Sequence, residues 1–167
     1  MRMSEGVEWC IHCAITLAML PAGQSLPGAQ LAELHGVPAP YLAKHLQAMS
    51  RAGLITSQPG PRGGYRLARP ANEITVLDVV EAVEGAEPAF RCAEIRRQGA
   101  VALEAPTSVK VCCVARTMDR ADAAWRNELR ATTIEDLVVA QRLQARPGAL
   151  AELSTWFATV ARRPRRV

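Results

Sequence analysis

Apolar residues recur at intervals of three and four through the first third of the chain, which is the spacing of amphipathic helices. The pattern predicts helices over residues 4–20 and 25–35, which end at Pro21 and Gly36. A third helix follows the turn at Pro38, and its inner face carries a line of apolar side chains: Leu42, Leu46 and Met49. Its opposite face is polar, so we expect this helix to lie on the surface with an exposed front.

Two short strands are predicted next, over residues 54–57 and 65–67. The loop between them, residues 58–64, is rich in glycine and proline, which permits a tight reversal, and carries Arg62 at its tip. Helix, turn, helix and glycine-rich hairpin in this order are typical of a winged helix-turn-helix. The fold class is therefore predicted as mainly α with a small β-hairpin wing.

A further helix over residues 74–83, with Thr75 as its N-cap, is expected to complete the winged domain, which we place at residues 1–85. Residues 86–112 have no clear periodicity and contain scattered proline and glycine. A loop of this length is uncommon in a compact domain and is often functional, so these residues are predicted to form a sensor loop.

A long helix is predicted to start at Cys112 or Cys113, and its apolar stripe contains Val114, Met118, Ala121, Trp125 and Leu129. A stripe beyond a complete winged domain indicates pairing with a second subunit. We therefore place a dimerisation region at residues 113–145, which includes a last helix capped by Thr133. Residues 146–167 are expected to be a looser extension, with one amphipathic segment and a mobile basic end.

The polar front of the third helix and the wing are the candidate DNA-binding elements. A recognition helix needs an apolar back and hydrogen-bonding groups that reach base edges in the major groove. The net charge of +4 and pI of about 9.0 suit an anionic partner such as double-stranded DNA. The candidate DNA-binding residues are Pro40, Tyr41, Lys44, His45, Gln47, Arg51, Arg62, Gly63 and Tyr65.

Several of these segments carry a family resemblance that spans residues 1 to 140. The matching segments are Leu31-Ala32-Glu33, Tyr41-Leu42-Ala43-Lys44, Arg51-Ala52-Gly53-Leu54, Gly63-Gly64-Tyr65-Arg66-Leu67 and Ile74-Thr75-Val76-Leu77-Asp78. The chain thereby resembles the Rrf family of bacterial winged-helix regulators, the family of IscR, NsrR and RsrR. The resemblance implies a homodimer on a near-palindromic operator, and an iron–sulfur cluster whose state changes DNA affinity.

The cysteine spacing departs from the usual pattern of this family, in which three cysteines lie close together in the loop. Here Cys92 stands where the first is expected, and Cys112 and Cys113 follow much later. The N-terminal segment instead resembles the RsrR branch, which uses a Glu and a His of the first helix, at positions matched here by Glu8 and His12.

Glu8 and His12 are one helical turn apart, so they share one face, and a carboxylate with an imidazole is a workable iron-binding pair. The candidate ligands are therefore Glu8, His12, Cys92, Cys112 and Cys113, with Cys112 preferred among the thiols. Cys92 or Cys113 would supply the second thiolate of a [2Fe–2S] cluster. Cys112 with Cys113 is the less favoured pair, because neighbouring residues rarely both point at one centre.

Cys10 and Cys13 fall on the leucine face of the first helix, so they are predicted to be core residues. His35 and His45 are expected to face the surface or the DNA rather than a metal.

The sequence thus predicts a redox-responsive DNA-binding regulator, acting as a repressor, and not an enzyme, because it contains no recognisable nucleophile–base pairing or phosphate loop. The alternative is a cluster-free winged-helix regulator switched by cysteine thiols, zinc or a small ligand. A winged helix used only for protein contacts is a further possibility. With no signal-peptide pattern and no long apolar run, a cytoplasmic location without membrane contact is expected.

Overall fold

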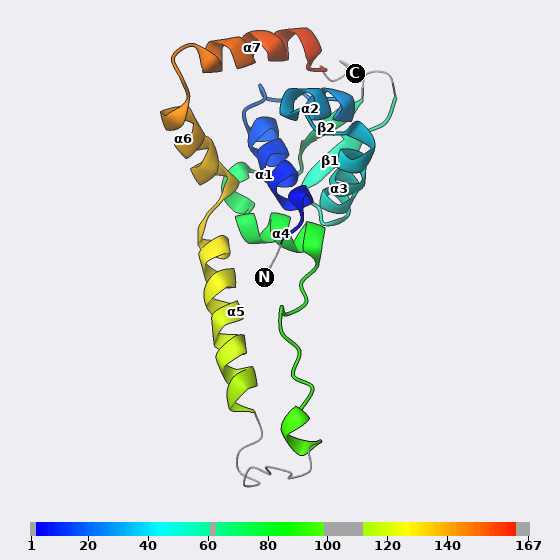
Figure 1. Ribbon diagram of the computed structural model, residues 1–167. Helices are drawn as coiled ribbons and strands as arrows, with labels where there is room; N and C mark the ends of the chain where they lie inside the picture. The colour runs from blue at the N-terminus through cyan, green and yellow to red at the C-terminus, as the bar shows by residue number, and fades with distance from the viewer. Residues whose placement is uncertain (1–2, 61–62, 99–111, 163–167) are drawn as a thin grey trace.

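The computed structural model describes residues 3–60, 63–98 and 112–162, which contain seven α-helices and one small β-hairpin. The order of the first elements is that of a winged helix-turn-helix (Figure 1). These elements are α1 (Glu5–Ala18), α2 (Gly28–His35), α3 (Ala39–Arg51), β1 (Ile55–Gln58), β2 (Gly64–Leu67) and α4 (Val76–Glu84). The predicted fold class is confirmed, and the predicted helices and strands are found within a few residues of their expected ends.

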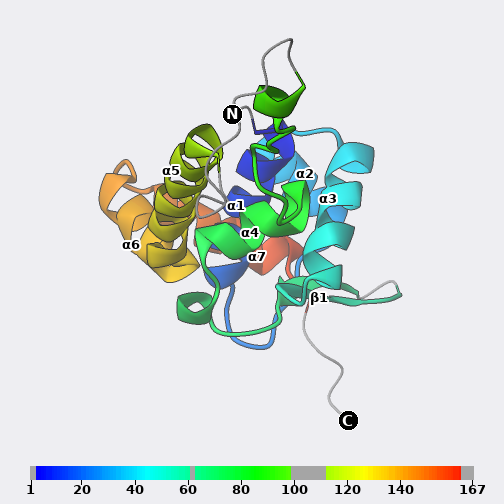
Figure 2. The same cartoon turned by 90° about the horizontal axis from the view of Figure 1, so that it is seen from below.

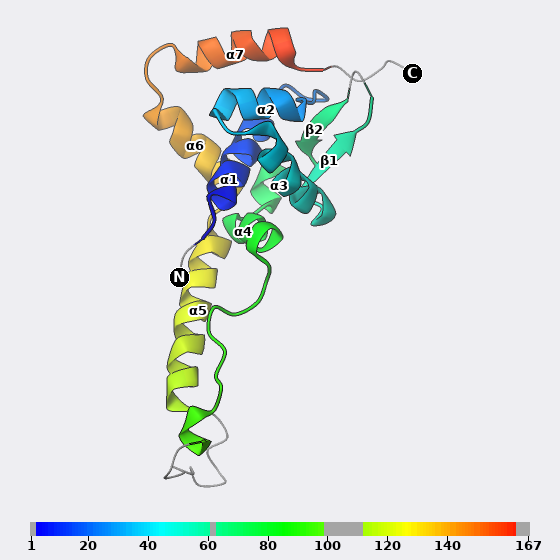
Figure 3. The same ribbon diagram turned by 45° about the vertical axis from the view of Figure 1, so that its right-hand side comes forward.

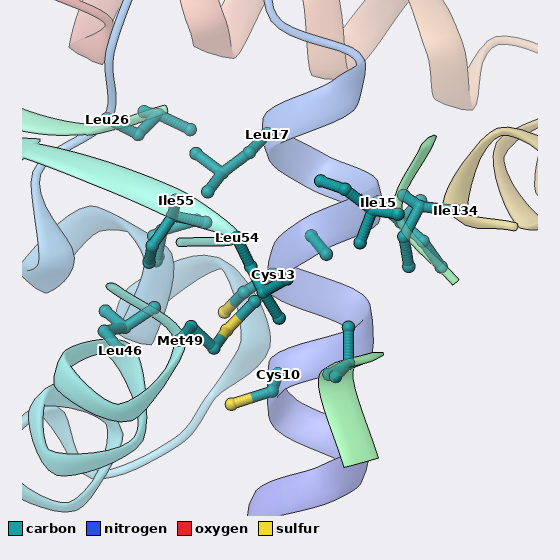
Figure 4. Close-up of a cluster of buried hydrophobic side chains, with 14 of the residues drawn as sticks. Cys10, Cys13, Ile15, Leu17, Leu26, Leu46, Met49, Leu54, Ile55 and Ile134 are labelled. Atoms are coloured by element: carbon teal, nitrogen blue, oxygen red, sulfur yellow. The ribbon is translucent and has the colours of Figure 1, made fainter. Parts of the chain in front are cut away.

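Helix α1 runs through the centre of the winged domain and supplies much of its core (Figure 4). Cys10 and Cys13 are fully buried and point toward the side of α1 on which Leu46 and Met49 of α3 lie. Ile15, which the helical spacing places on the same face as Glu8 and His12, is buried beside Ile134. That face therefore contributes to the core at one end and is exposed at the other.

The β-hairpin belongs to a slightly larger sheet than the sequence predicts. β1 and β2 pair in antiparallel register from Ile55 opposite Leu67 to Gln58 opposite Gly64. Residues Ser25 and Leu26, predicted to begin a helix, are extended instead, and Leu26 exchanges two backbone hydrogen bonds with Tyr65. The helix starts only at Gly28, because the backbone groups of Leu26 pair with Tyr65 and those of Ser25 pair with Arg162.

Gly64 is required where β2 passes Leu26. A Cβ atom at this position would lie 2.6 Å from the carbonyl carbon of Leu26, well inside van der Waals contact. Glycine is therefore the residue that permits the close approach of these two backbones.

Helices α4 and α6 (Ile134–Gln144) begin side by side, each with a capping box. Thr75 accepts from the backbone N–H of Asp78, and Thr133 accepts from that of Asp136. The N–H of Ile134 also donates to the carbonyl of Ile74, which ties the two starts together. The spacing of Thr and Asp predicts both caps, and both are confirmed.

Helix α5 (Cys113–Ala131) projects away from the winged domain as an arm, with residues 86–98 running beside it (Figures 1 and 3). Near the domain, Trp125 and Leu129 pack on a small cluster that includes Val80. At the far end, Val114 and Met118 are 55% and 40% exposed. The predicted apolar stripe is thus divided. Among the described residues, its near half packs on the winged domain and its far half is exposed.

Helix α7 (Ala149–Val160) lies across the end of the winged domain opposite the arm (Figure 1). Phe157 is buried in the main core, with Leu153 and Trp156 packed around it. The amphipathic segment expected in this extension is thus found as a helix, and it docks on the domain instead of being loose because it has enough apolar surface.

Candidate DNA-binding face and sensor site

The front of α3 is exposed, as its binary pattern predicts. Tyr41 is 67% exposed, and Pro40, Lys44, Gln47 and Arg51 are also exposed. The opposite side of the helix is anchored by buried Leu42, Leu46 and Met49. Helix α3 therefore presents an aromatic ring, an amide and two cations from a rigid support, which is the arrangement required for reading base edges.

Two of the predicted DNA-contacting side chains are placed differently from this front. His45 turns toward α1, where its ring lies over Gly6 and meets Trp9 edge-on at 6.0 Å between ring centroids. Tyr65 is half-buried against Gly28 at the start of α2. Both side chains are partly buried against other elements of the winged domain, so each leaves only part of its surface exposed.

The wing is only partly described. Gly63 donates its N–H to the carbonyl of Gly60 and closes the turn of the hairpin. Arg62, predicted at the tip, lies outside the described residues. Figure 2, which views the molecule from below, shows α3 and the hairpin extending toward the same side of the domain.

The three downstream cysteines gather at the far end of the α5 arm. Cys112 is the N-cap residue of α5, Cys113 is its first residue, and Cys92 comes from the segment beside it. They line a cavity of about 630 Å³ with apolar neighbours that include Phe90 and Ile95. Cys92 and Cys113 are exposed, so these thiols are accessible to a metal or an oxidant.

The start of α5 activates Cys112. The backbone N–H groups of Ala115 and Val114, followed by the Arg96 guanidinium and the neighbouring Cys92, hold the pKa of the Cys112 thiol below its ordinary value, against a smaller opposing effect of burial. Orphan N–H groups and a positive dipole at a helix N-terminus stabilise a thiolate. Cys112 is therefore the thiol best prepared to be a ligand or a nucleophile.

Cys10 and Cys13 have the opposite chemistry. Burial raises the pKa of both thiols to about 12, and for Cys13 the proximity of Cys10 adds to the effect. Neutral, buried thiols behave as small apolar side chains. The prediction that these two residues belong to the core is confirmed.

Glu8 and His12 are exposed on α1 and line a groove of about 420 Å³ at the N-terminal end of the domain. His35, from the end of α2, lies beside this groove, with 5.9 Å between its ring centroid and that of His12. It also hydrogen-bonds Thr16 at 3.1 Å, and partial burial, with the charge of His12, lowers its pKa. His35 thus packs on α1 rather than facing solvent or DNA.

Within one subunit the two halves of the predicted metal site do not meet. Over residues 3–60, 63–98 and 112–162, no group of three or more His, Cys, Asp or Glu side chains is arranged to hold a metal ion. Glu8 and His12 belong to the winged domain, whereas the cysteines lie at the end of the arm (Figure 3). A site that uses both halves requires two subunits.

Two charged residues beside the cysteines were not identified from the sequence. Arg96 donates to Glu94 at 2.9 Å, and Glu94 accepts from the Cys92 thiol at 3.8 Å. Arg96 is mostly buried and faces the cavity that holds Cys112. No motif marks these residues, because their position depends on a short 3₁₀ turn over Ile95–Arg97 within the irregular loop.

The fold and the exposed front of α3 define a winged-helix DNA-binding regulator. Residues 3–140 match the model of the Rrf2 family, described as an iron-dependent transcriptional regulator, and the chain belongs to this family. That description is of a transcription regulator rather than an enzyme. Bacillus subtilis YwgB, named as an HTH-type transcriptional regulator, is 30% identical over 139 residues, which are 83% of this chain and 85% of YwgB.

Solved structures share the fold. CymR, the global cysteine regulator of B. subtilis, matches with a TM-score of 0.64 at 23% identity over 84% of this chain and 98% of its own. The IscR of T. potens matches with a TM-score of 0.64 at 20% identity over 90% of this chain and 96% of its own. In the described part of the chain, no helix is long and apolar enough to cross a membrane.

Proposed function

We propose that this protein is a cytoplasmic, homodimeric transcription regulator that represses from a near-palindromic operator and is controlled by a [2Fe–2S] cluster. The observation that carries the proposal is the activated Cys112 thiol beside Cys92, at the exposed end of a projecting helix. The family description, an iron-dependent transcriptional regulator, agrees with an iron cofactor. Within this proposal, the winged domain reads DNA and the arm senses the signal.

The donor set fits an iron–sulfur cluster shared between subunits. A [2Fe–2S] cluster takes four ligands, normally thiolates, and can accept nitrogen ligands in place of some of them. Cys112 and Cys92 would supply two from one subunit, with Cys113 as the substitute for Cys92. Glu8 and His12 are exposed one turn apart on α1 and would supply the other two from the partner. When bound, the cluster would supply one-electron redox chemistry.

The exposed far half of α5 supports a dimer. Val114 and Met118 form an apolar face on the same arm that carries the cysteines. Pairing of two arms would cover this face and bring the thiols of one subunit to the domain of the other. Residues 86–112 would then be the sensor loop, residues 113–145 the dimerisation region and residues 1–85 the DNA-binding domain.

The cluster is tested by purification without oxygen, followed by the visible spectrum and iron and sulfide analysis. Two iron and two sulfide per cluster are expected, with partial bleaching on reduction. Cys112→Ala, Glu8→Ala and His12→Ala should abolish the chromophore while leaving a folded dimer. Cys10→Ala is the matched control, because that thiol is buried in the core. A chromophore unchanged in Glu8→Ala and His12→Ala would exclude those ligands.

A cluster-free thiol switch is the second candidate, favoured by the proximity of Cys92 to Cys112. An oxidant such as a peroxide would remove two electrons and two protons from these thiols to form a disulfide. Zinc at these thiols, or a small ligand in the 630 Å³ cavity, would be variants of this mechanism. A colourless, iron-free protein whose DNA affinity changes with peroxide but not with zinc or metal chelation would favour the thiol switch.

DNA reading is tested at α3. Tyr41→Ala and Lys44→Ala should each lower affinity for a selected operator by roughly tenfold to a hundredfold and relax sequence preference. Pro40, Gln47 and Arg51 complete the proposed α3 contacts, with Arg62 and Gly63 contacting DNA from the wing. If both α3 variants kept full DNA affinity and sequence preference, the assignment of α3 as the DNA-reading helix would be overturned. A winged domain used only for protein contacts would then be favoured.

A further inference from the structure

An arginine at the end of the α5 arm has one nitrogen atom without a partner. The side chain of Arg96 is 19% exposed, and its Nη2 atom is buried with no hydrogen-bond acceptor. In the described part of the chain, no other buried side-chain nitrogen or oxygen lacks a partner. An unpaired buried donor costs free energy, and an acceptor that meets it removes this cost. The Nη2 atom is therefore available to a group that carries negative charge.

The rest of the Arg96 guanidinium is held by Glu94. The Nε–H of Arg96 donates to one carboxylate oxygen of Glu94 at 2.9 Å, and the Cys92 thiol donates to the other at 3.8 Å. Glu94 has a φ of 51°, and no other non-glycine residue of the described ranges has a left-handed backbone. This uncommon conformation comes directly before the turn Ile95–Arg97, which carries the guanidinium. Both the hydrogen bond and the backbone thus fix the direction of Arg96.

The acceptors within the same cavity include sulfur atoms. Three thiols line it together with Arg96: Cys92, Cys112 and Cys113. The backbone N–H groups at the start of α5 have the largest part in lowering the pKa of the Cys112 thiol, and the charge of Arg96 adds to their effect. A thiolate beside a guanidinium accepts a charge-assisted hydrogen bond, which is stronger than a neutral one.

We propose that Arg96, positioned by Glu94, stabilises the negative charge that gathers on sulfur at the end of the α5 arm. Where it concerns a cluster, the inference rests on the proposed function and deepens it, because it names a residue that sets the redox poise without binding iron. Arginine has no acceptor atom and stays protonated, so its role is electrostatic. One-electron reduction of a bound cluster adds negative charge beside Arg96, and a cation at this place raises the reduction potential.

The first measurement is the reduction potential of the protein purified without oxygen, titrated with dithionite and followed by the visible spectrum. R96Q removes the positive charge and should lower the equilibrium constant for reduction roughly tenfold, which is about 59 mV for one electron. R96K keeps the charge but loses the planar fork, so its potential should lie between those of R96Q and the wild type.

E94Q distinguishes charge from structure. Its amide oxygen can still accept from Nε of Arg96, but the negative charge is gone. The potential should therefore rise in E94Q and fall in R96Q. A residue that only supported the loop would move the potential in the same direction in both variants, and that result would overturn the inference.

The second measurement needs no cluster. In folded, cluster-free protein at pH 7, the Cys112 thiolate attacks the methylene carbon of iodoacetamide and iodide leaves. R96Q should slow this alkylation roughly threefold or more, because a smaller share of the thiol is ionised. R96K should restore most of the rate.

Arg91→Gln is the matched control. Arg91 lines the same cavity, but its side chain is 77% exposed and pairs with Glu87 at 2.7 Å. Removal of this solvated charge should change neither the potential nor the alkylation rate. Equal shifts in R91Q and R96Q would show an effect of net charge alone and would overturn the role of Arg96, as would an unchanged potential and rate in R96Q. Protein without iron would overturn the proposed cluster control, and the alkylation rates would still decide the role of Arg96.

Discussion

The two groups of cysteines in this chain, two in the winged domain and three at the end of the α5 arm, lie in opposite surroundings. Cys10 and Cys13 are buried in the core, where desolvation raises the pKa of each thiol to about 12. Cys112, beside Cys92, sits at a helix N-terminus near an arginine, and its thiol pKa is lowered. Cysteine is thus a core residue in one region and a reactive thiol in the other. Burial and the local electrostatic field determine the difference.

The largest predicted difference between the two regions is in thiol reactivity. In cluster-free, folded protein, Cys112 should react with iodoacetamide at least about a thousandfold faster than Cys10 or Cys13, because only the thiolate reacts and the buried thiols are neutral and enclosed. Since the pKa of Cys112 is lowered, its rate should reach a plateau below the pH expected for an ordinary thiol, whose pKa is 9.0. Mass spectrometry of labelled peptides against pH measures both effects.

The core cysteines should become reactive only when the domain unfolds. Adding urea should therefore bring the labelling rates of Cys10 and Cys13 toward that of Cys112. Labelling of Cys10 in the folded protein at a rate comparable to Cys112 would show that the winged core is open, and would remove the basis of the comparison.

Truncating a side chain should also lower the free energy of unfolding more in the winged domain than in the segment beside the α5 arm. Leu46→Ala deletes a side chain that is 1% exposed and should lower the free energy of unfolding by about 2–5 kcal/mol. Ile95→Ala, in the segment beside the arm, changes a side chain that is 76% exposed and should alter it by less than about 0.5 kcal/mol. Urea unfolding at one protein concentration gives both values. A similar cost for both variants would indicate that Ile95 is covered in the assembled protein.

This contrast also explains how much of the molecule could be predicted from the sequence. The elements of the winged domain follow from local signals: the Gly36 cap, the Thr75–Asp78 spacing and the apolar positions of α3. The sequence pattern predicts that His45 on α3 and Tyr65 on the wing contact DNA, but their surroundings come from α1 and α2, which periodicity within one element does not report.

The end of the α5 arm was harder to predict for the same reason. The cysteines could be identified as candidates, but Arg96 and Glu94 could not, since an irregular loop brings them to the thiols. The pairing of Arg162 with Ser25 could not be predicted either, because an isolated backbone bridge leaves no side-chain pattern.

Substitutions in the exposed far half of the α5 apolar stripe should weaken dimerisation, which is a smaller effect than the loss of a core side chain. Trp125 and Leu129 pack within their own subunit, whereas Met118 is expected to pack on a second subunit. Met118→Ala should therefore weaken dimerisation by about 1–2 kcal/mol per subunit, measured by dissociation on dilution in analytical ultracentrifugation. Leu143→Ala on α6, where the side chain is 83% exposed, is the control and should leave the dimer constant unchanged. The reverse result would move the dimer interface from α5 to α6.

The smallest predicted effect concerns the contact between the start of α1 and the end of α4, where the segment that runs beside α5 begins. The backbone N–H and hydroxyl of Ser4 both donate to one carboxylate oxygen of Glu84, at 2.9 and 2.6 Å, and these bonds lower the pKa of Glu84. A carboxyl with a lowered folded-state pKa stabilises the fold above its ordinary pKa, and this contribution is lost as pH falls through the folded value.

Because Ser4 and Glu84 are exposed, Glu84→Gln should lower the free energy of unfolding by less than about 1 kcal/mol at neutral pH. The difference from the wild type should shrink toward zero in acid. Urea unfolding of both proteins at several pH values measures it, and Glu87→Gln, whose carboxylate pairs only with exposed Arg91 among the described contacts, is the matched control. If the Glu84 difference persisted unchanged below the carboxyl pKa, the side chain would act through packing rather than charge, and the contact would not couple the two regions electrostatically.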